Sequence, residues 1–314
     1  MADPRLQRTS RELFLAVLTG GAPDLETWVI DRLTSVVDEE DVAAGKRLFA
    51  RGEQPEYIFF SREGRLRLER EGRPGWLFEG RTVVGVFDAL LDRPHERTAV
   101  ALTDLHLLKL RVEHWLELLE DSFGLVRAAV GNASRTVAAL EARGWAAQTA
   151  PRGLVIAQVP AFAGPLSFVD RLAIFAEAPL LRGAGIQVLV ELVDSMQEVT
   201  FEPGESLFER DLWRGESFFV LEGEVEGMRL DPEIKVLFGP GSFVGGVASL
   251  GEAILAWSAR AVTRVRALSM SHDDWFDLME EHFDLVRSAL AQLALVRETI
   301  LEELEGTAGE LRVG

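Results

Sequence analysis

The chain repeats itself, and this internal duplication constrains its fold more than any other feature of the sequence. The segment WLELLE that begins at Trp115 is matched by the segment WFDLME that begins at Trp275, 160 residues later. Four further pairs agree in order at an offset of 160 or 159 residues: Gly85 with Gly245, Thr103 with Thr263, Gly64 with Gly223, and Gly45 with Gly204. Ordered agreement at so many points indicates a tandem duplication with one insertion or deletion.

Each copy follows a plan of one helix, several short strands and a second helix. Short apolar runs such as 57–60 and 66–68 are separated by glycine-containing turns, which is typical of a small antiparallel roll or barrel. The opening helix is expected over 25–37 in the first copy and from 186 to 192 in the second. The closing helices carry apolar residues spaced by three and four: 123, 126, 130, 133, 137 and 140, and then 286, 289, 293, 296 and 300. We therefore predict a mainly β fold with flanking helices (α+β).

The repeat and the composition between its copies give the expected domain limits. We expect an N-terminal helical segment at 1–19, a first domain at 20–143, a linker rich in Ala, Gly and Pro at 144–168, a second domain at 169–305 and a tail at 306–314. A chain of 314 residues is long enough for two domains of ordinary size.

Composition and charge exclude several classes of protein. The sequence has no cysteine, so disulfides and thiolate metal sites are excluded, and no apolar run approaches the roughly 20 residues of a membrane span. The net charge of −18 argues against direct binding to DNA, because such binding relies on neutralising phosphates. Residues 1–160 carry a net charge of −3 and residues 161–314 carry −15, so the first half is the better host for an anionic ligand. We expect a cytoplasmic protein without membrane contact.

Two stretches of the second copy resemble the strand signature of the cyclic nucleotide-binding domain family. They are EPGESLF at 202–208 and GESFFVLEGEV at 215–225. The first copy matches more loosely, and its VGVFDALLDRP at 84–94 is similar to the phosphate-binding cassette of that family. The resemblance covers about 20–143 and 172–305. It implies two tandem domains of double-stranded β-helix, or jelly-roll-like, architecture.

The resemblance also implies which residues of the first copy face a ligand. In members that bind nucleotide, a Gly-Glu pair opens the cassette, its Glu binds the ribose 2′-hydroxyl, and a later Arg pairs with the cyclic phosphate. In this chain Gly85 fits, but Val86 replaces the Glu and His95 replaces the Arg. Arg97 lies two residues further, and because a strand repeats every two residues, it is expected on the same side as position 95.

The candidate ligand-binding residues of the first domain are therefore Gly85, Val86, Asp88, Arg97 and Thr98, with Asp88 as a substitute ribose ligand. An alternative interpretation remains open for two of them. Arg97 is then a solvated surface residue paired with Glu96, and Asp88 is an ordinary turn or helix-start aspartate.

The second cassette departs further from the family. Gly246 follows Gly245 where the Glu is expected, Leu255 stands at the position of the Arg, and Trp257 matches Arg97. We predict a degenerate site formed by Gly245, Gly246, Leu255, Trp257 and Ser258. A large apolar residue in a strand is more often part of the core, and this is the expectation for Trp257.

The sequence offers no catalytic constellation. The run Ser271-His272-Asp273 resembles hydrolytic chemistry, but its place before Trp275 makes Ser271 a helix cap. His114 and Glu117 have the spacing of half a metal site, and no second pair accompanies them. The glycine-rich segment at 239–246 lacks the Lys-Ser/Thr of a P-loop. We therefore predict neither an enzyme nor a metal site.

Two hypotheses for a regulatory or interaction protein follow. In the first, the first domain binds a cyclic nucleotide such as cAMP or cGMP, the one cofactor that the sequence suggests, and the closing helices transmit its occupancy. In the second, nucleotide binding is weakened in the first domain and lost in the second, and the protein acts through protein contacts or oligomerisation. Helices 122–143 and 283–305 are the expected contact elements, either with a second chain or with each other.

Overall fold

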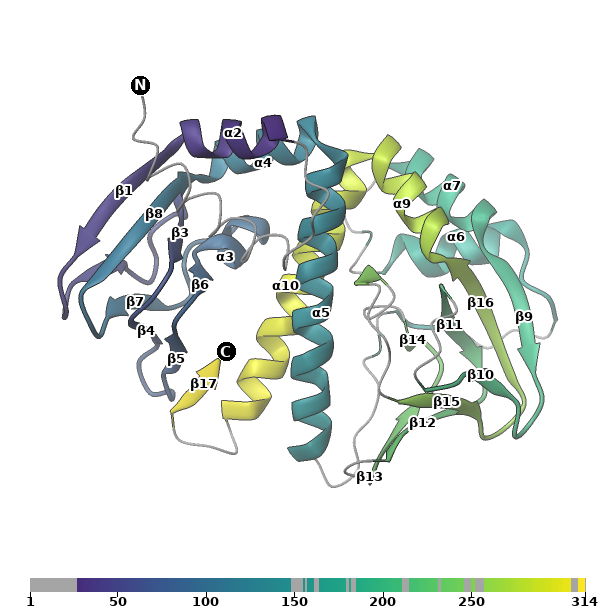
Figure 1. The fold of residues 1–314 in the computed structure, drawn as a ribbon. Helices are drawn as coiled ribbons and strands as arrows, with labels where there is room; N and C mark the ends of the chain where they lie inside the picture. Colours follow the sequence, from purple (N-terminus) through teal and green to yellow (C-terminus); the bar gives the residue numbers. More distant parts are fainter. Residues whose placement is uncertain are drawn as a thin grey trace. The chain divides into compact units, whose positions relative to one another are not determined.

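The computed structural model describes residues 27–147, 155, 157–160, 164–178, 181, 185–210, 215–230, 233–245, 250–251, 257–305 and 310–313. The described residues form two compact units. The first unit comprises 27–132 together with 294–305 and 310–313, and the second comprises the residues between 133 and 293 (Figure 1). The helical segment predicted at 1–19 lies outside the described residues.

The first unit is a roll of two facing antiparallel sheets. Its strands are β1 (Val37–Val42), β2 (Arg47–Phe49), β3 (Tyr57–Ser61), β4 (Arg65–Glu69), β5 (Trp76–Glu79), β6 (Thr82–Val84), β7 (Thr98–Ala101) and β8 (Leu105–Arg111). One sheet has the order β1-β8-β3-β6, and the other contains β5-β4-β7-β2. The strands predicted at 57–60 and 66–68 are thus confirmed as β3 and β4.

The second unit repeats this topology strand for strand. Its strands are β9 (Gln197–Phe201), β10 (Ser206–Phe208), β11 (Glu216–Glu222), β12 (Val225–Leu230), β13 (Glu233–Phe238), β14 (Phe243–Val244), β15 (Ser258–Ala261) and β16 (Val265–Ser271). The sheet orders β9-β16-β11-β14 and β13-β12-β15-β10 mirror those of the first unit. The predicted tandem β-roll fold with flanking helices is therefore confirmed.

Two irregularities of the backbone recur in both rolls. The register shifts between Arg47 and Phe49 in the first roll and between Ser206 and Phe208 in the second, as expected for a repeated β-bulge. Gly223 has a φ of 87°, and a Cβ there would lie 2.2 Å from the carbonyl oxygen of Arg264. Its counterpart Gly64 has the same conformation, so this turn requires glycine in both copies.

The helices begin and end the rolls. They are α2 (Thr27–Ser35), α3 (Val86–Leu90), α4 (Val112–Asp121) and α5 (Phe123–Ala147), followed by α6 (Phe168–Ala176), α7 (Ile186–Ser195), α9 (His272–Glu281) and α10 (Phe283–Glu305). Helix α5 continues four residues past the predicted end at 143, through a stretch that contains two alanines, the strongest helix formers. Among the described residues no helix has the length and apolarity needed to cross a membrane.

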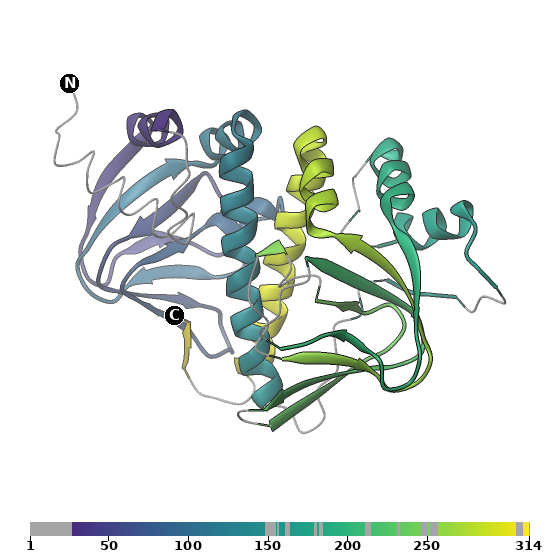
Figure 2. The same cartoon turned by 45° about the vertical axis from the view of Figure 1, so that its right-hand side comes forward.

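The C-terminal segment completes the first unit. Residues 294–305 of α10 belong to that unit, and β17 (Leu311–Val313) pairs in parallel with β5, with Leu311 opposite Trp76 and Val313 opposite Phe78. Figure 2 shows this strand, near the C-terminal label, beside the blue strands of the first roll. The sheet that contains β5 therefore has five strands, and β17 is its edge strand.

The apolar spacing of the closing helices is satisfied inside the single chain. Val126, Val130 and Val137 of α5 are buried, as are Val286, Leu293 and Val296 of α10. These side chains need no second copy of the chain to be removed from water.

Candidate functional site

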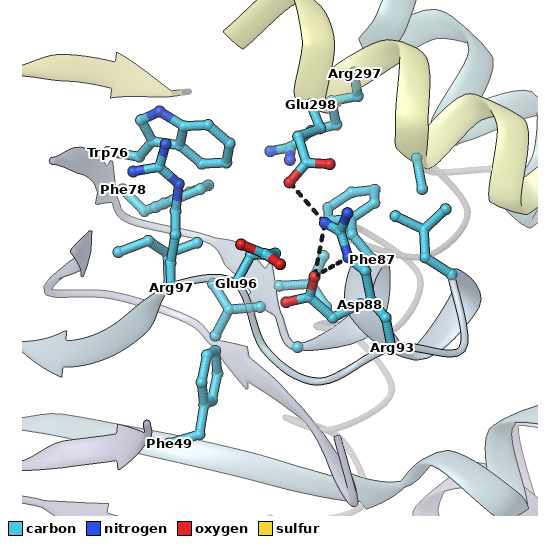
Figure 3. Close-up of a pocket in the computed structure, with 16 residues that line it drawn as sticks. Phe49, Trp76, Phe78, Phe87, Asp88, Arg93, Glu96, Arg97, Arg297 and Glu298 are labelled. Atoms are coloured by element: carbon cyan, nitrogen blue, oxygen red, sulfur yellow. Dashed lines mark hydrogen bonds and ion pairs between the residues drawn. The ribbon is translucent and has the colours of Figure 1, made fainter. Parts of the chain in front are cut away.

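A small cavity lies in the first unit where α3, β5 and α10 approach one another. It is lined by residues of the predicted cassette, by aromatic residues of the roll and by Ala294, Arg297 and Glu298 of α10 (Figure 3). Its volume is about 40 Å³, which is space for a few water molecules. Of the candidate ligand-binding residues, Gly85, Asp88 and Arg97 line this cavity.

Gly85 forms the start of the cassette because only glycine fits there. Its φ is 90°, and a Cβ at this position would lie 2.7 Å from the carbonyl oxygen of Tyr57 on β3. The chain then enters α3, whose first residue, Val86, is buried in the roll and does not line the cavity. The short helix directs Asp88 towards the cavity (Figure 3).

Arg97 is the central cation of the site. Its guanidinium lies over the ring of Trp76, 3.8 Å from the centroid, and forms an ion pair with Glu305 at the end of α10. The alternative of a solvated Arg97 paired with Glu96 is wrong: Arg97 is 3% exposed, and Glu96 instead faces Arg70 at 3.6 Å. Burial lowers the pKa of Arg97, an effect that outweighs the attraction of Glu305.

A second ion-pair group holds Asp88. Arg93 donates to the Asp88 carboxylate at 3.0 Å through Nε, and to Glu298 of α10 at 2.6 Å through a terminal nitrogen. The other oxygen of Asp88 lies 3.1 Å from Nδ1 of His95, whose ring stacks on Phe49 with centroids 3.8 Å apart. Asp88 lies in the first turn of α3, as the alternative of a helix-start aspartate predicts, and both of its oxygens are in addition engaged inside the site.

Thr98 does not join the other candidates. It begins β7, its hydroxyl accepts a hydrogen bond of 3.1 Å from the backbone N–H of Arg51, and it lines a different, open depression on the surface. Side chains alternate along this segment: His95, Arg97 and Ala99 are buried, whereas Thr98 is half-buried. The prediction that Arg97 projects to the same side as position 95 agrees with this alternation.

Three glutamates of α10 contact arginines of the first roll. Glu298, Glu302 and Glu305 are spaced by four and three residues and therefore share one face of the helix. They pair with Arg93 at 2.6 Å, with Arg70 at 3.2 Å, and with Arg97, respectively. Arg73 adds a second, longer contact to Glu305 at 3.7 Å. We call this set of contacts the α10 latch.

The corresponding position of the second unit is filled by aromatic packing. Trp257 stacks on Phe238 with centroids 5.5 Å apart and meets Phe208 edge-on at 4.8 Å. Trp257 packs against the apolar core of this roll, in agreement with the expectation for it. Gly245 follows β14 with a φ of 77°, and Ser258 begins β15 opposite Met228. Gly246 and Leu255 lie outside the described residues.

Sequence reasoning missed the residues that α10 contributes to the first roll. Glu298, Glu305 and Arg297 are more than 190 positions from the cassette, and no local pattern connects them to it. One signal was available for Arg297. Leu290, Ala294, Leu301 and Leu304 are buried along one face of α10, and Arg297 is a charge in the middle of this apolar face.

Solved structures that match the chain include the regulatory domain of Toxoplasma gondii PKA with cAMP, at 13% identity and a TM-score of 0.33, covering 93% of this chain and 97% of that one. The regulatory subunit of a cAMP-independent protein kinase A from Trypanosoma brucei matches at 16% identity and a TM-score of 0.36, covering 98% and 95%. Thermus thermophilus catabolite activator protein matches at 26% identity and a TM-score of 0.36, covering 41% and 62%. No curated protein sequence matches the chain.

The family itself is shown by a direct match to the sequence. The family model described as the cyclic nucleotide-binding domain matches residues 39–122 and again 198–282. These two matches fall on the two rolls and together cover more than half of the chain. The chain therefore belongs to the cyclic nucleotide-binding domain family and contains two such domains in tandem.

Proposed function

We propose that this chain is a non-enzymatic regulatory protein that acts through protein contacts, and that its first domain has its nucleotide position closed by its own α10 latch. The observation that carries this proposal is the engagement of Arg97. A guanidinium that is buried, stacked on Trp76 and paired with Glu305 is not free to bind a cyclic phosphate. The remaining cavity of about 40 Å³ is too small for a nucleotide.

The second domain supports the same conclusion by other means. Trp257 takes the place that Arg97 has in the first domain, and its ring is packed between Phe208 and Phe238. A phosphate has no cationic partner at that position, and removal of the indole would leave a void in the core of the roll. We therefore assign no nucleotide to the second domain.

Exposed apolar side chains on the second unit support a role in protein contacts. Val169 on α6 and Ile186 on α7 are 70% and 71% exposed, and Phe168 and Val190 lie exposed on the same two helices, which pack on each other. Apolar residues gathered on a surface commonly mark interaction sites. We propose this α6–α7 surface, in place of the buried spacing of α5 and α10, as the contact region for a protein partner.

A second candidate function is a sensor in which a ligand opens the latch. It is favoured by the fact that Gly85, Asp88 and Arg97 of the cassette line one cavity. Glu305 is an anion that a phosphate group can replace at Arg97, and the exchange would release the end of α10. In this mechanism the occupancy of the first domain controls the position of α10.

Calorimetric titration of the full chain with cAMP and with cGMP tests the proposal. We expect no binding heat from the wild type and none from Arg97→Ala. Micromolar binding by the wild type that Arg97→Ala abolishes would overturn the proposal in favour of the sensor. Glu305→Gln serves as the informative variant, since it removes the competing charge while keeping the shape of the side chain. For a sensor it raises nucleotide affinity at least tenfold, and Glu302→Gln, at the more exposed pair, changes it much less.

A further inference from the structure

Arg297 of α10 lines the first-unit cavity and takes no part in the latch. Its guanidinium carbon lies 4.1 Å from the ring centroid of Phe87 and 6.0 Å from that of Phe78. The residue is 7% exposed, and its Nε is buried without a hydrogen-bond partner. It makes no hydrogen bond or ion pair with any residue that the structure describes. Figure 3 shows it beside Glu298 at the upper end of the site.

The charge of Arg297 is retained despite this burial. Desolvation lowers the pKa of Arg297 to about 10, so that the side chain remains protonated at neutral pH. A buried guanidinium that makes no charge-assisted hydrogen bond is strongly unfavourable in the interior of a protein. The aromatic ring of Phe87 offsets part of this cost, because the face of the ring attracts a cation.

The carboxylates that line the cavity are directed at other cations. Glu298, the next residue along α10, attracts Arg297 electrostatically, but its carboxylate pairs with Arg93 at 2.6 Å. Asp88 pairs with Arg93 and His95, and Glu96 faces Arg70. Among the residues that the structure describes, none accepts a hydrogen bond from Arg297, and its N–H donors are left for a ligand.

We propose that this cavity binds a small inorganic anion of the size of chloride, with the Arg297 guanidinium as its cationic partner. Two observations carry the assignment: a nine-tenths buried arginine that makes no hydrogen bond or ion pair with the described residues, and an adjoining cavity of about 40 Å³. One water molecule needs only about 10–15 Å³ of such space, so the cavity accepts a monatomic ion and is too small for a nucleotide. The bound anion fixes α10 against α3 and thereby adds to the latch.

Thermal unfolding of the full chain at constant ionic strength tests this site, with chloride replacing gluconate, which is too large for the cavity. We expect the unfolding midpoint of the wild type to rise with chloride and to saturate, because a ligand that binds only the folded state stabilises it. Arg297→Met should abolish the rise, whereas Arg287→Met, at an exposed arginine of the same helix, should preserve it. Ala294→Val fills the cavity without changing the charge and should also abolish the rise.

Crystals grown with bromide supply the direct observation, since the ion should give an anomalous peak within hydrogen-bond distance of Arg297. A midpoint independent of chloride, or a peak-free cavity that holds water only, would overturn the proposal. An equal chloride effect in Arg297→Met would place the anion elsewhere, and a larger effect of phosphate than of chloride would exclude a monatomic site. The outcome is independent of the cAMP titrations, because the anion binds with the latch closed.

Discussion

The two rolls share a strand plan but close the same position with different chemistry. Arg97 and Trp257 lie 160 residues apart at matched positions. The first is held by a carboxylate from α10, and the second is held by two aromatic rings of its own roll. In an ionic contact another anion can take the place of the carboxylate, whereas removing an aromatic side chain from its packing leaves a void. The first position is therefore held by an ionic contact and the second by aromatic packing.

The two closing helices, α5 and α10, also differ in whether they make ionic or apolar contacts. Each continues past its own roll into the other unit, since α5 contributes residues from 133 onward to the second unit and α10 contributes residues from 294 onward to the first. Glu298 of α10 pairs with Arg93, while the matching residue of α5, Ala138, packs against the apolar core of the second roll. The polar face of α10 is thus specific to the first domain.

Breaking the ionic closure should have the largest effect on stability. Glu305→Ala leaves Arg97 buried without its counter-ion, and we expect the free energy of unfolding to fall by about 3–5 kcal/mol. The double variant Arg97→Met/Glu305→Leu should recover most of this loss, because neither charge then remains. Urea denaturation followed by circular dichroism measures both values.

Glu302→Ala provides the matched control for that cycle. Glu302 lies on the same face of α10 as Glu305 and pairs with Arg70, but both side chains of this pair are about 30% exposed. The expected loss in the free energy of unfolding is therefore below about 1 kcal/mol. Equal losses for Glu302→Ala and Glu305→Ala would contradict the buried character of the Arg97 contact.

The aromatic closure should be nearly as costly to remove. Trp257→Ala deletes a side chain that packs on Phe208 and Phe238, and we expect a loss of about 3 kcal/mol, at the low end for tryptophan because the residue is partly exposed. Leu230→Ala, at a residue of β12 in the same roll that is 56% exposed, should cost less than about 0.5 kcal/mol. If the two variants unfold at the same urea concentration, the packing of Trp257 does not stabilise the position in the second domain that matches Arg97.

The contrast between the domains also shows how far the sequence predicts this molecule. The repeat, the strands and the Ser271 cap follow from local patterns, and so does the placement of Arg97 on the side of position 95. These features depend on turn glycines, on alternation and on helix-cap chemistry, all of which act over a few residues. They locate the cassette, but they do not identify the residue of α10 that pairs with Arg97 there.

The residue that pairs with Arg97 could not be predicted from the sequence, because it comes from the far end of the chain. Glu305 reaches Arg97 across 208 positions, and nothing in α10 taken alone distinguishes a latch from a solvated acidic face. Thr98 was misplaced for a different reason. Thr98 was placed in the site by its resemblance to the family motif, but the alternation that buries Arg97 turns the next side chain away from the cavity.

The pH dependence of stability should distinguish the two closing helices. Burial raises the pKa of Glu141 on α5 to about 7, whereas the matching residue of α10 is the buried Leu301. Because the pKa is raised above its unfolded value of 4.5, the folded state holds the proton more tightly. The stability that this proton contributes is present below about pH 4.5 and is lost as the pH rises through 7.

We therefore expect Glu141→Leu to reduce the fall in unfolding free energy between pH 5 and pH 8 by roughly 2 kcal/mol. Urea denaturation at the two pH values measures it. Glu117→Leu, at an exposed carboxylate, is the matched control and should leave the pH dependence as in the wild type. A pH dependence unchanged in Glu141→Leu would show that this carboxylate titrates normally.

The smallest expected difference lies at the start of the short helices after each roll. Ser271 caps α9 by accepting a hydrogen bond of 3.0 Å from the backbone N–H of Asp274, whereas its counterpart, Arg111, gives α4 no side-chain cap. Ser271→Ala should cost about 1 kcal/mol, and Arg111→Ser should gain up to about 1 kcal/mol, both by denaturant unfolding. Arg111 also contacts Tyr57 and Glu113, but these contacts are exposed and weak. A loss of stability in Arg111→Ser would mean that the contacts of Arg111 with Tyr57 and Glu113 stabilise the first domain more than a side-chain cap of α4 would. In that case a charged surface contact in the first domain takes the place of the helix cap of the second.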